Sequence, residues 1–175
     1  VPVANDICVP AFPVMQHLFN TGHINWVLSA YLLGLAIGQF VYGPLSDRFG
    51  RKPILLIGLS VYLVGCVMTL TTISFPCFLV ARLVQAMGAC SVIISAFAMI
   101  RDCHNKDDLA QPMGVVMAII GVAPTIAPLL GSILLVYVGW KSTFVFQLIL
   151  GLFFTGMIAI FCRETQYKKY KQSLH

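Results

Sequence analysis

Charged residues are scarce in this sequence of 175 residues, since Asp, Glu, Lys and Arg together make up only 10% of it. Soluble domains carry roughly one-quarter charged residues, so this scarcity excludes an ordinary water-soluble fold. A helix needs about 20 largely apolar residues to cross a bilayer. Charge is absent from runs of about this length or more: 7–46, 53–81, 83–100, 109–140 and 142–162. The sequence therefore predicts a protein that lies almost entirely within a membrane.

Alternation of polar and apolar residues is also missing from these runs. Backbone groups inside a bilayer must bond within helices or closed barrels, and barrel strands alternate, so helices are predicted. Short links join the segments, which predicts an all-α bundle of six antiparallel transmembrane helices over 1–162. We expect the first helix to lack its N-terminal part, because the chain opens at Val1 without a charged leader. The predicted segments are 1–18, 24–45, 53–73, 76–100, 112–138 and 143–162.

Motifs of enzymes and metal sites are lacking as well. The six cysteines form no CxxC pair. We interpret them as small apolar fillers of helices rather than as a disulfide framework. The four histidines are not spaced with Cys, Asp or Glu as in a zinc site, and no phosphate-binding loop or nucleophile elbow is present. We therefore predict no enzymatic activity, no metal and no cofactor.

Positive charge, where it occurs, collects at one set of predicted helix ends. Nine of the eleven Lys and Arg residues lie within 48–52, 101–106 and 163–171, whereas Lys141 lies on the opposite side. Because Lys and Arg accumulate on cytoplasmic loops, we predict that the 2–3 loop, the 4–5 loop and the tail 163–175 are cytoplasmic. The net charge of +5 then needs no nucleic-acid partner. The tail is interpreted as a positive stop or as the start of a linker to further helices, with lipid-headgroup binding as the alternative.

A dense motif of glycines and charges joins the second and third predicted helices. It reads Gly-Pro-Leu-Ser-Asp-Arg-Phe-Gly-Arg-Lys-Pro over 43–53. On composition alone it is a positive loop with turn residues, and Pro53 suits the first turn of a helix. It closely resembles the signature G-x-L-a-D-r-x-G-R-k of the major facilitator superfamily of transporters. The resemblance implies that its glycine permits close packing and that its charges lock cytoplasmic helix ends, favouring the outward-facing state. The implied gating residues are Gly43, Asp47, Arg48, Gly50, Arg51, Lys52 and, after the fourth helix, Asp102.

An arginine lies inside the fourth predicted span. Such a residue is costly in a bilayer and usually faces a cavity or a partner. Arg82 is only about 9 Å along the helix from Pro76, so reaching the outer surface is the alternative. The stretch 82–89 resembles the superfamily pattern R-x-x-q-G-x-g-a, with Ala86 in place of the first glycine. We interpret Arg82 as a functional residue.

Prolines and small residues mark the fifth predicted helix. The stretch 123–132 resembles the antiporter motif g-x-x-x-G-P-x-x-G-G when Pro128 takes the proline position, although alanines and a serine replace three of its glycines. Pro124 and Pro128 share a helical face and lack amide donors, so we expect a bend. Close packing of small residues, Gly131 included, would also explain the pattern.

An aspartate lies in the first predicted segment. If that helix ends near Leu18, Asp6 is about 18 Å deep, just past the centre of a core about 30 Å thick. The stretch 5–13 resembles the D-x-Y-L-P-A-L-P stretch of the Bcr/CflA group of drug:proton antiporters, with Cys8 and Val9 in place of Tyr-Leu. Similar stretches at 34–47 and 100–102 extend the resemblance over almost the whole chain, as the first six helices of a twelve-helix family.

The resemblance implies the N-terminal half of a transporter in a bacterial-type inner membrane. The complete protein would export a drug or small metabolite in exchange for protons, by alternating access between two six-helix halves. Asp6 and Arg82 would couple proton and substrate, and Tyr31 and Gln39 would line the cavity. The partners would be a small-molecule substrate, protons, the lipid bilayer and a C-terminal half. A metabolite or sugar-like solute importer of the same fold, insensitive to the proton gradient, is one alternative. A non-transporting membrane scaffold is the other, but it leaves a buried Asp6 and Arg82 unexplained.

Overall fold

The computed structural model describes residues 2–103 and 108–162, and this part of the chain is built from helices and their links. Each of α3 to α7 is long and apolar enough to cross a membrane. The all-α prediction is therefore confirmed, whereas the predicted cytoplasmic tail 163–175 lies outside the described residues. The elements are α1 (Pro2–Asp6), the 3-10 helix η1 (Val9–Ala11), α2 (Phe12–Leu18), α3 (Trp26–Phe49), α4 (Arg51–Thr71), α5 (Phe75–Cys103), α6 (Ala110–Val138) and α7 (Lys141–Phe161).

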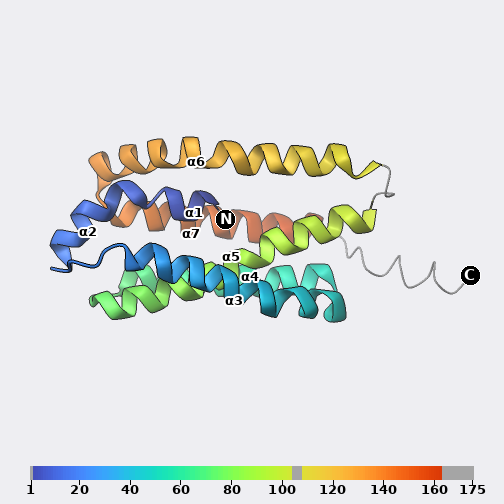
Figure 1. Ribbon diagram of the computed structural model, residues 1–175, viewed down its shortest axis with the longest axis horizontal. Helices are drawn as coiled ribbons and strands as arrows, with labels where there is room; N and C mark the ends of the chain where they lie inside the picture. Colours follow the sequence, from blue (N-terminus) through green and yellow to red (C-terminus); the bar gives the residue numbers. More distant parts are fainter. Residues whose placement is uncertain (1, 104–107, 163–175) are drawn as a thin grey trace, which may run out of the picture.

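The long helices run along one common axis and reverse direction at each link (Figure 1). Helix α5 packs closely against both α3 and α4, and α7 packs against α4. The short pieces α1 and η1 pack against α6, so the first segment lies between α6 and the remaining helices. The two ends of the bundle differ: the α3–α4 link lies at one end, and the α6–α7 link at the other (Figure 1).

The first predicted segment is broken into three helical pieces rather than forming one helix over 1–18. Pro10 and Pro13 lack amide donors, and each stands in the first turn of a new piece, where no donor is needed. At the break the Cys8 amide donates to the Asn5 carbonyl at 3.1 Å, a tighter 3-10 bond. In a continuous α-helix that amide would bond the Ala4 carbonyl. The break therefore releases the Ala4 carbonyl for other donors.

Small residues set the closest helix approaches. A Cβ at Gly34 of α3 would clash with the Leu83 carbonyl oxygen of α5. A Cβ at Gly131 of α6 would clash with the Ile7 carbonyl oxygen of the first segment. Backbones can approach this closely only where the side chain is a hydrogen atom, which fits the small-residue packing given above for the helix with Gly131.

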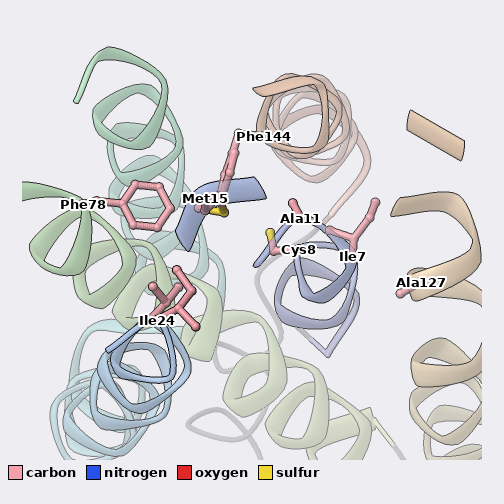
Figure 2. Close-up of a cluster of buried hydrophobic side chains, with 9 residues drawn as sticks. Ile7, Cys8, Ala11, Met15, Ile24, Phe78, Ala127 and Phe144 are labelled. Atoms are coloured by element: carbon pink, nitrogen blue, oxygen red, sulfur yellow. The ribbon is translucent and has the colours of Figure 1, made fainter. Parts of the chain in front are cut away.

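A buried apolar cluster ties the first segment to α5, α6 and α7 (Figure 2). Ile7 faces Ala127 of α6, while Met15 lies towards Phe78 and Phe144. The rings of Phe78 and Phe144 meet edge to face with centroids 5.7 Å apart. Phe78 lies one helical turn before Arg82 on α5, so this cluster borders the environment of the buried arginine.

Candidate functional site

Arg82 lies inside the bundle with 0% of its surface exposed. It therefore does not reach the outer surface, as the alternative interpretation would require. Its Nη1 donates to Gln85 Oε1 at 2.8 Å and to the Ala4 carbonyl oxygen at 3.4 Å. Its Nη2 donates to Asn5 Oδ1 at 3.4 Å. The first segment thus supplies two of these three oxygen acceptors: the Ala4 carbonyl freed by the break and the side-chain oxygen of Asn5.

Two aromatic rings flank the same guanidinium. Its central carbon lies 4.5 Å from the ring centroid of Tyr31 on α3 and 5.8 Å from that of Phe144 on α7. The negative face of an aromatic ring attracts a cation, and the attraction is stronger where water is excluded. Tyr31 is itself 1% exposed. The structure therefore places Tyr31, one of the predicted cavity residues, directly at Arg82.

Among the described residues, the positive charge of Arg82 has only neutral partners. Within the described ranges, no carboxylate oxygen lies within 4.0 Å of the guanidinium, and its Nε has no hydrogen-bond partner. Taking an ion out of water costs several kcal/mol in real proteins, and hydrogen bonds to neutral groups recover only part of this cost. The site therefore holds a buried cation that would attract a carboxylate or another anion.

Asp6, the second predicted coupling residue, lies at the end of α1 and is partly buried. Its Oδ1 accepts a hydrogen bond from Asn5 Nδ2 at 3.2 Å. The structure thus brings Asp6 to the Arg82 site without pairing the two directly. The side chain of Asn5, which was not a predicted site residue, lies between them. Its signal was its position next to Asp6 in a segment with few polar residues.

A ring of hydrogen bonds continues from Arg82 through two buried glutamines. Gln85 Nε2 donates to Gln147 Oε1 of α7 at 2.7 Å, and Gln147 Nε2 donates to Cys8 Sγ at 3.2 Å. Cys8 Sγ donates at 3.6 Å to the Ala4 carbonyl, which also accepts from Arg82, and so the ring closes. Arginine only donates, so Gln85 must turn its oxygen towards Arg82, and this choice orients Gln147 as well.

Gln85 and Gln147 were not among the predicted site residues. Gln147 lies in the second turn of α7 between two short apolar runs, and a polar residue in a span is itself a signal of function. Gln39, which was selected, lies exposed on α3 two turns beyond Tyr31 and does not contact this buried ring. Polarity within a span thus identified candidates, but only the fold shows which of them meet.

A charged cluster lies at the other predicted site, where α3 and α5 end and α4 begins. Arg51 Nη1 pairs with Asp47 Oδ1 at 2.6 Å and Arg51 Nε with Asp102 Oδ2 at 3.0 Å. Arg51 Nη1 also donates to Ser46 Oγ at 3.1 Å. Lys52 Nζ donates to the Ala159 carbonyl of α7 at 2.9 Å. We call Asp47, Arg51 and Asp102 the charge lock, because they join three helix ends.

The remaining residues of the 43–53 motif shape the turn. Gly50 is the single residue between α3 and α4, and its φ of 101° lies in the region that favours glycine. Arg48 lies over the ring of the adjacent Phe49, 5.4 Å from its centroid. A Cβ at Gly43 would meet no atom of another described helix within 4 Å. The close packing that the resemblance implies for Gly43 therefore does not occur within the described residues.

The proline motif lies within one helix, α6, which runs through both prolines. Pro124 is exposed, and Pro128 is half-buried, with its carbonyl accepting from Ser132 Oγ at 2.8 Å. Gly131 is buried against the backbone at Ile7. The motif thus provides the surface on which the broken first segment rests, one residue before Cys8 and the hydrogen-bond ring.

Known proteins share both the sequence and the fold. The chain is 36% identical over 157 residues to a chloramphenicol resistance protein of Pseudomonas aeruginosa, covering 88% of this chain and 36% of that protein. It is 31% identical over 166 residues to multidrug resistance protein D of Escherichia coli K12, covering 94% of this chain and 42% of that protein. The human organic anion transporter MFSD10 (TETRAN) has the same fold, with a TM-score of 0.70 at 22% identity over 94% of this chain and 45% of that one. The chain thus spans less than half the length of these relatives.

The family signature extends over nearly the whole chain. Residues 2–174 match the Major Facilitator Superfamily. A bicyclomycin resistance protein homolog of Haemophilus influenzae, 29% identical over 96% of this chain and 43% of that protein, agrees with the Bcr/CflA resemblance of the first segment. The family prediction is confirmed: this chain belongs to the Major Facilitator Superfamily, a family of multi-pass membrane transporters, and its relatives include several proteins named for drug resistance.

Proposed function

We propose that this chain is the N-terminal six-helix half of a proton-coupled efflux transporter for drug-like molecules or small metabolites. The observation that carries the proposal is the buried Arg82, which has neutral partners and lies one side chain away from Asp6. Relatives named for resistance to chloramphenicol, bicyclomycin or multiple drugs support export rather than import. A scaffold would gain nothing from a buried cation that costs several kcal/mol.

Asp6 is the proposed proton carrier. An ionised Asp6 and the Arg82 cation attract one another strongly in a site that excludes water, whereas a protonated Asp6 does not. Binding of a proton at Asp6 therefore changes the forces on the first segment and on α5. A cationic group of a substrate would compete with the proton for the carboxylate, which is the requirement for exchange. The competition links what Asp6 binds, a proton or a substrate cation, to the conformation of the six-helix half.

The charge lock is the proposed gate. By the distribution of Lys and Arg, its end of the bundle is cytoplasmic. Pairing of Arg51 with Asp47 and Asp102 holds the ends of α3, α4 and α5 together. Closing this end favours the outward-facing state, and opening it requires the pairs to break. Proton and substrate binding at the buried site would shift the balance between the two states by their different affinities for each.

Efflux measurements on the complete transporter test this function. Cells that express the full gene are loaded with a panel of fluorescent cationic and neutral dyes, and release is followed with and without a protonophore. Release that stops when the proton gradient is discharged supports proton-coupled export. Gradient-insensitive uptake of a sugar-like solute would indicate the importer. No flux of any tested solute by a correctly inserted protein would indicate the scaffold.

A further inference from the structure

The side chain of Asn5 connects the two residues of the proposed coupling site. Its Oδ1 accepts from Arg82 Nη2 at 3.4 Å, and its Nδ2 donates to Asp6 Oδ1 at 3.2 Å. One amide thus contacts both the buried cation and the carboxylate. We propose that Asn5 is a positioning residue that transmits the protonation of Asp6 to the Arg82 guanidinium; this inference rests on the proton-coupled function proposed above.

The direction of the amide is fixed by its neighbours. A guanidinium only donates hydrogen bonds, so Asn5 must turn its carbonyl oxygen towards Arg82. The amide NH2 group is then left for Asp6, which accepts at both oxygens when it is ionised. The arrangement is therefore complementary to an ionised Asp6, and the bond to a carboxylate is roughly twice as strong as one between neutral groups.

Protonation of Asp6 weakens this arrangement. The carboxyl group becomes neutral and gains an O–H donor, for which the Asn5 NH2 group is no acceptor. Asn5 is then held less firmly, and so is its oxygen at Arg82. The proton stays on Asp6 until it leaves to water or is displaced by a substrate cation, so no other reactant is needed.

The backbone around Asn5 is suited to such a movement. Asn5 lies in the last turn of α1, immediately before the break, and its carbonyl accepts the tight bond from the Cys8 amide. The Ala4 carbonyl next to it also accepts from Arg82. A change at Asn5 therefore acts on the first segment at its break and on α5 through the guanidinium.

The other titratable groups near Arg82 leave Asp6 as the group that changes charge. They are the Tyr31 phenol of α3, the Tyr62 phenol and Cys66 thiol of α4, and the Cys8 thiol of the first segment. Phenols and thiols are ordinarily neutral near pH 7. From α7, the neighbours are Phe144 and Gln147, which do not titrate.

The test separates coupling from transport as such. The complete transporter is reconstituted in proteoliposomes, and two rates are measured with one effluxed dye: net transport driven by an imposed pH difference, and gradient-independent exchange of labelled for unlabelled dye. Asn5→Leu keeps the approximate size and removes both hydrogen bonds. Asn5→Asp keeps an acceptor for Arg82 and removes the donor to Asp6. Asn25→Leu is the matched control, because Asn25 is exposed and its side chain makes no capping bond.

We expect both Asn5 variants to lose proton-driven transport by roughly tenfold or more, the usual effect of losing a bond to a charged group, while exchange changes by less than about twofold. The control should match the wild type in both rates. Proton-driven transport that persists in both Asn5 variants overturns the inference. An equal loss of both rates in both variants also overturns it, since that is the result of a merely structural role.

Failure of the underlying function gives a different result. If the wild-type transporter shows no proton-driven flux, the proposed function falls and the role of Asn5 falls with it. If the wild type transports and Asp6→Asn abolishes the proton-driven rate, but Asn5→Leu matches the wild type, only the role of Asn5 is refuted.

Discussion

The effect of substituting each aspartate of the charge lock can be estimated from the structure. Asp47 and Asp102 both pair with Arg51, but the side chain of Asp47 is 71% exposed and that of Asp102 only 4%. Ion pairs in water contribute about 0.2–1 kcal/mol, whereas removal of one partner from a buried pair costs roughly 3–5 kcal/mol. Replacing either aspartate by asparagine should therefore open the same end of the bundle to very different extents.

The two substitutions should differ by about an order of magnitude in how much they raise the population of the open state. For Asp102→Asn we expect the closed end to be destabilised by about 2 kcal/mol. This is less than the cost for a fully buried pair, because Arg51 is 12% exposed and keeps its bonds to Asp47 and Ser46. For Asp47→Asn we expect about 0.5 kcal/mol. At about 1.4 kcal/mol per factor of ten, these values correspond to roughly 30-fold and roughly twofold shifts towards the open state.

Hydrogen–deuterium exchange in the complete transporter measures these shifts directly. Amides of the 43–53 link exchange through opening of this end, so their rates follow the open population. Asp102→Asn should accelerate them by roughly 30-fold and Asp47→Asn by roughly twofold. Dye binding at equilibrium should survive in both variants, since the charge lock is remote from Arg82. Equal acceleration by the two substitutions, or a larger effect at Asp47, would refute the argument from burial.

Three further predictions concern the buried site and the chain as a whole. Asp6→Asn keeps size and hydrogen bonding but cannot exchange a proton. The variant should therefore fold but no longer transport dye against its gradient. Continued transport against the gradient under an imposed pH difference would exclude Asp6 as the proton carrier. Gly131→Ala should lower stability by about 1–3 kcal/mol, because its methyl group meets the Ile7 carbonyl, whereas Gly156→Ala has open space and should be neutral in thermal unfolding. Residues 1–175 alone, reconstituted in liposomes, should give no proton-dependent flux, and a measured flux would contradict the assignment as half of a transport unit.

The positions of the spans and the turn that carries Asp47 and Arg51 could be predicted from the sequence, because short stretches of sequence determine both. Charge-free runs fix where helices cross the membrane, whatever their neighbours are. The 43–53 motif fixes its own turn, since Gly50 alone separates α3 from α4 with a φ of 101°. Asp102 was expected from the resemblance as a gating residue. The short 72–74 link makes α4 and α5 antiparallel neighbours, so the end of α5 with Asp102 lies beside Arg51 at the start of α4.

The break in the first segment could not be predicted from its prolines alone. Pro10 and Pro13 begin new helical pieces, yet Pro124 and Pro128 lie inside the uninterrupted α6. A proline removes the same donor in each case. At the break in the first segment, the Ala4 carbonyl that the Cys8 amide leaves free accepts a hydrogen bond from Arg82 of α5. A donor from a distant helix cannot be read from a local pattern.

The hydrogen-bond ring shows why a departure from the family pattern carries information that the pattern does not. Cys8 stands where the Bcr/CflA stretch has tyrosine, and its thiol is fully buried between Gln147 and the Ala4 carbonyl. A phenol is several atoms larger and could not occupy this space without displacing Gln147, since cores are packed nearly without voids. Gln147 in turn accepts from Gln85, which accepts from Arg82. Cys8 of the first segment therefore takes part in how the buried cation is held from α7.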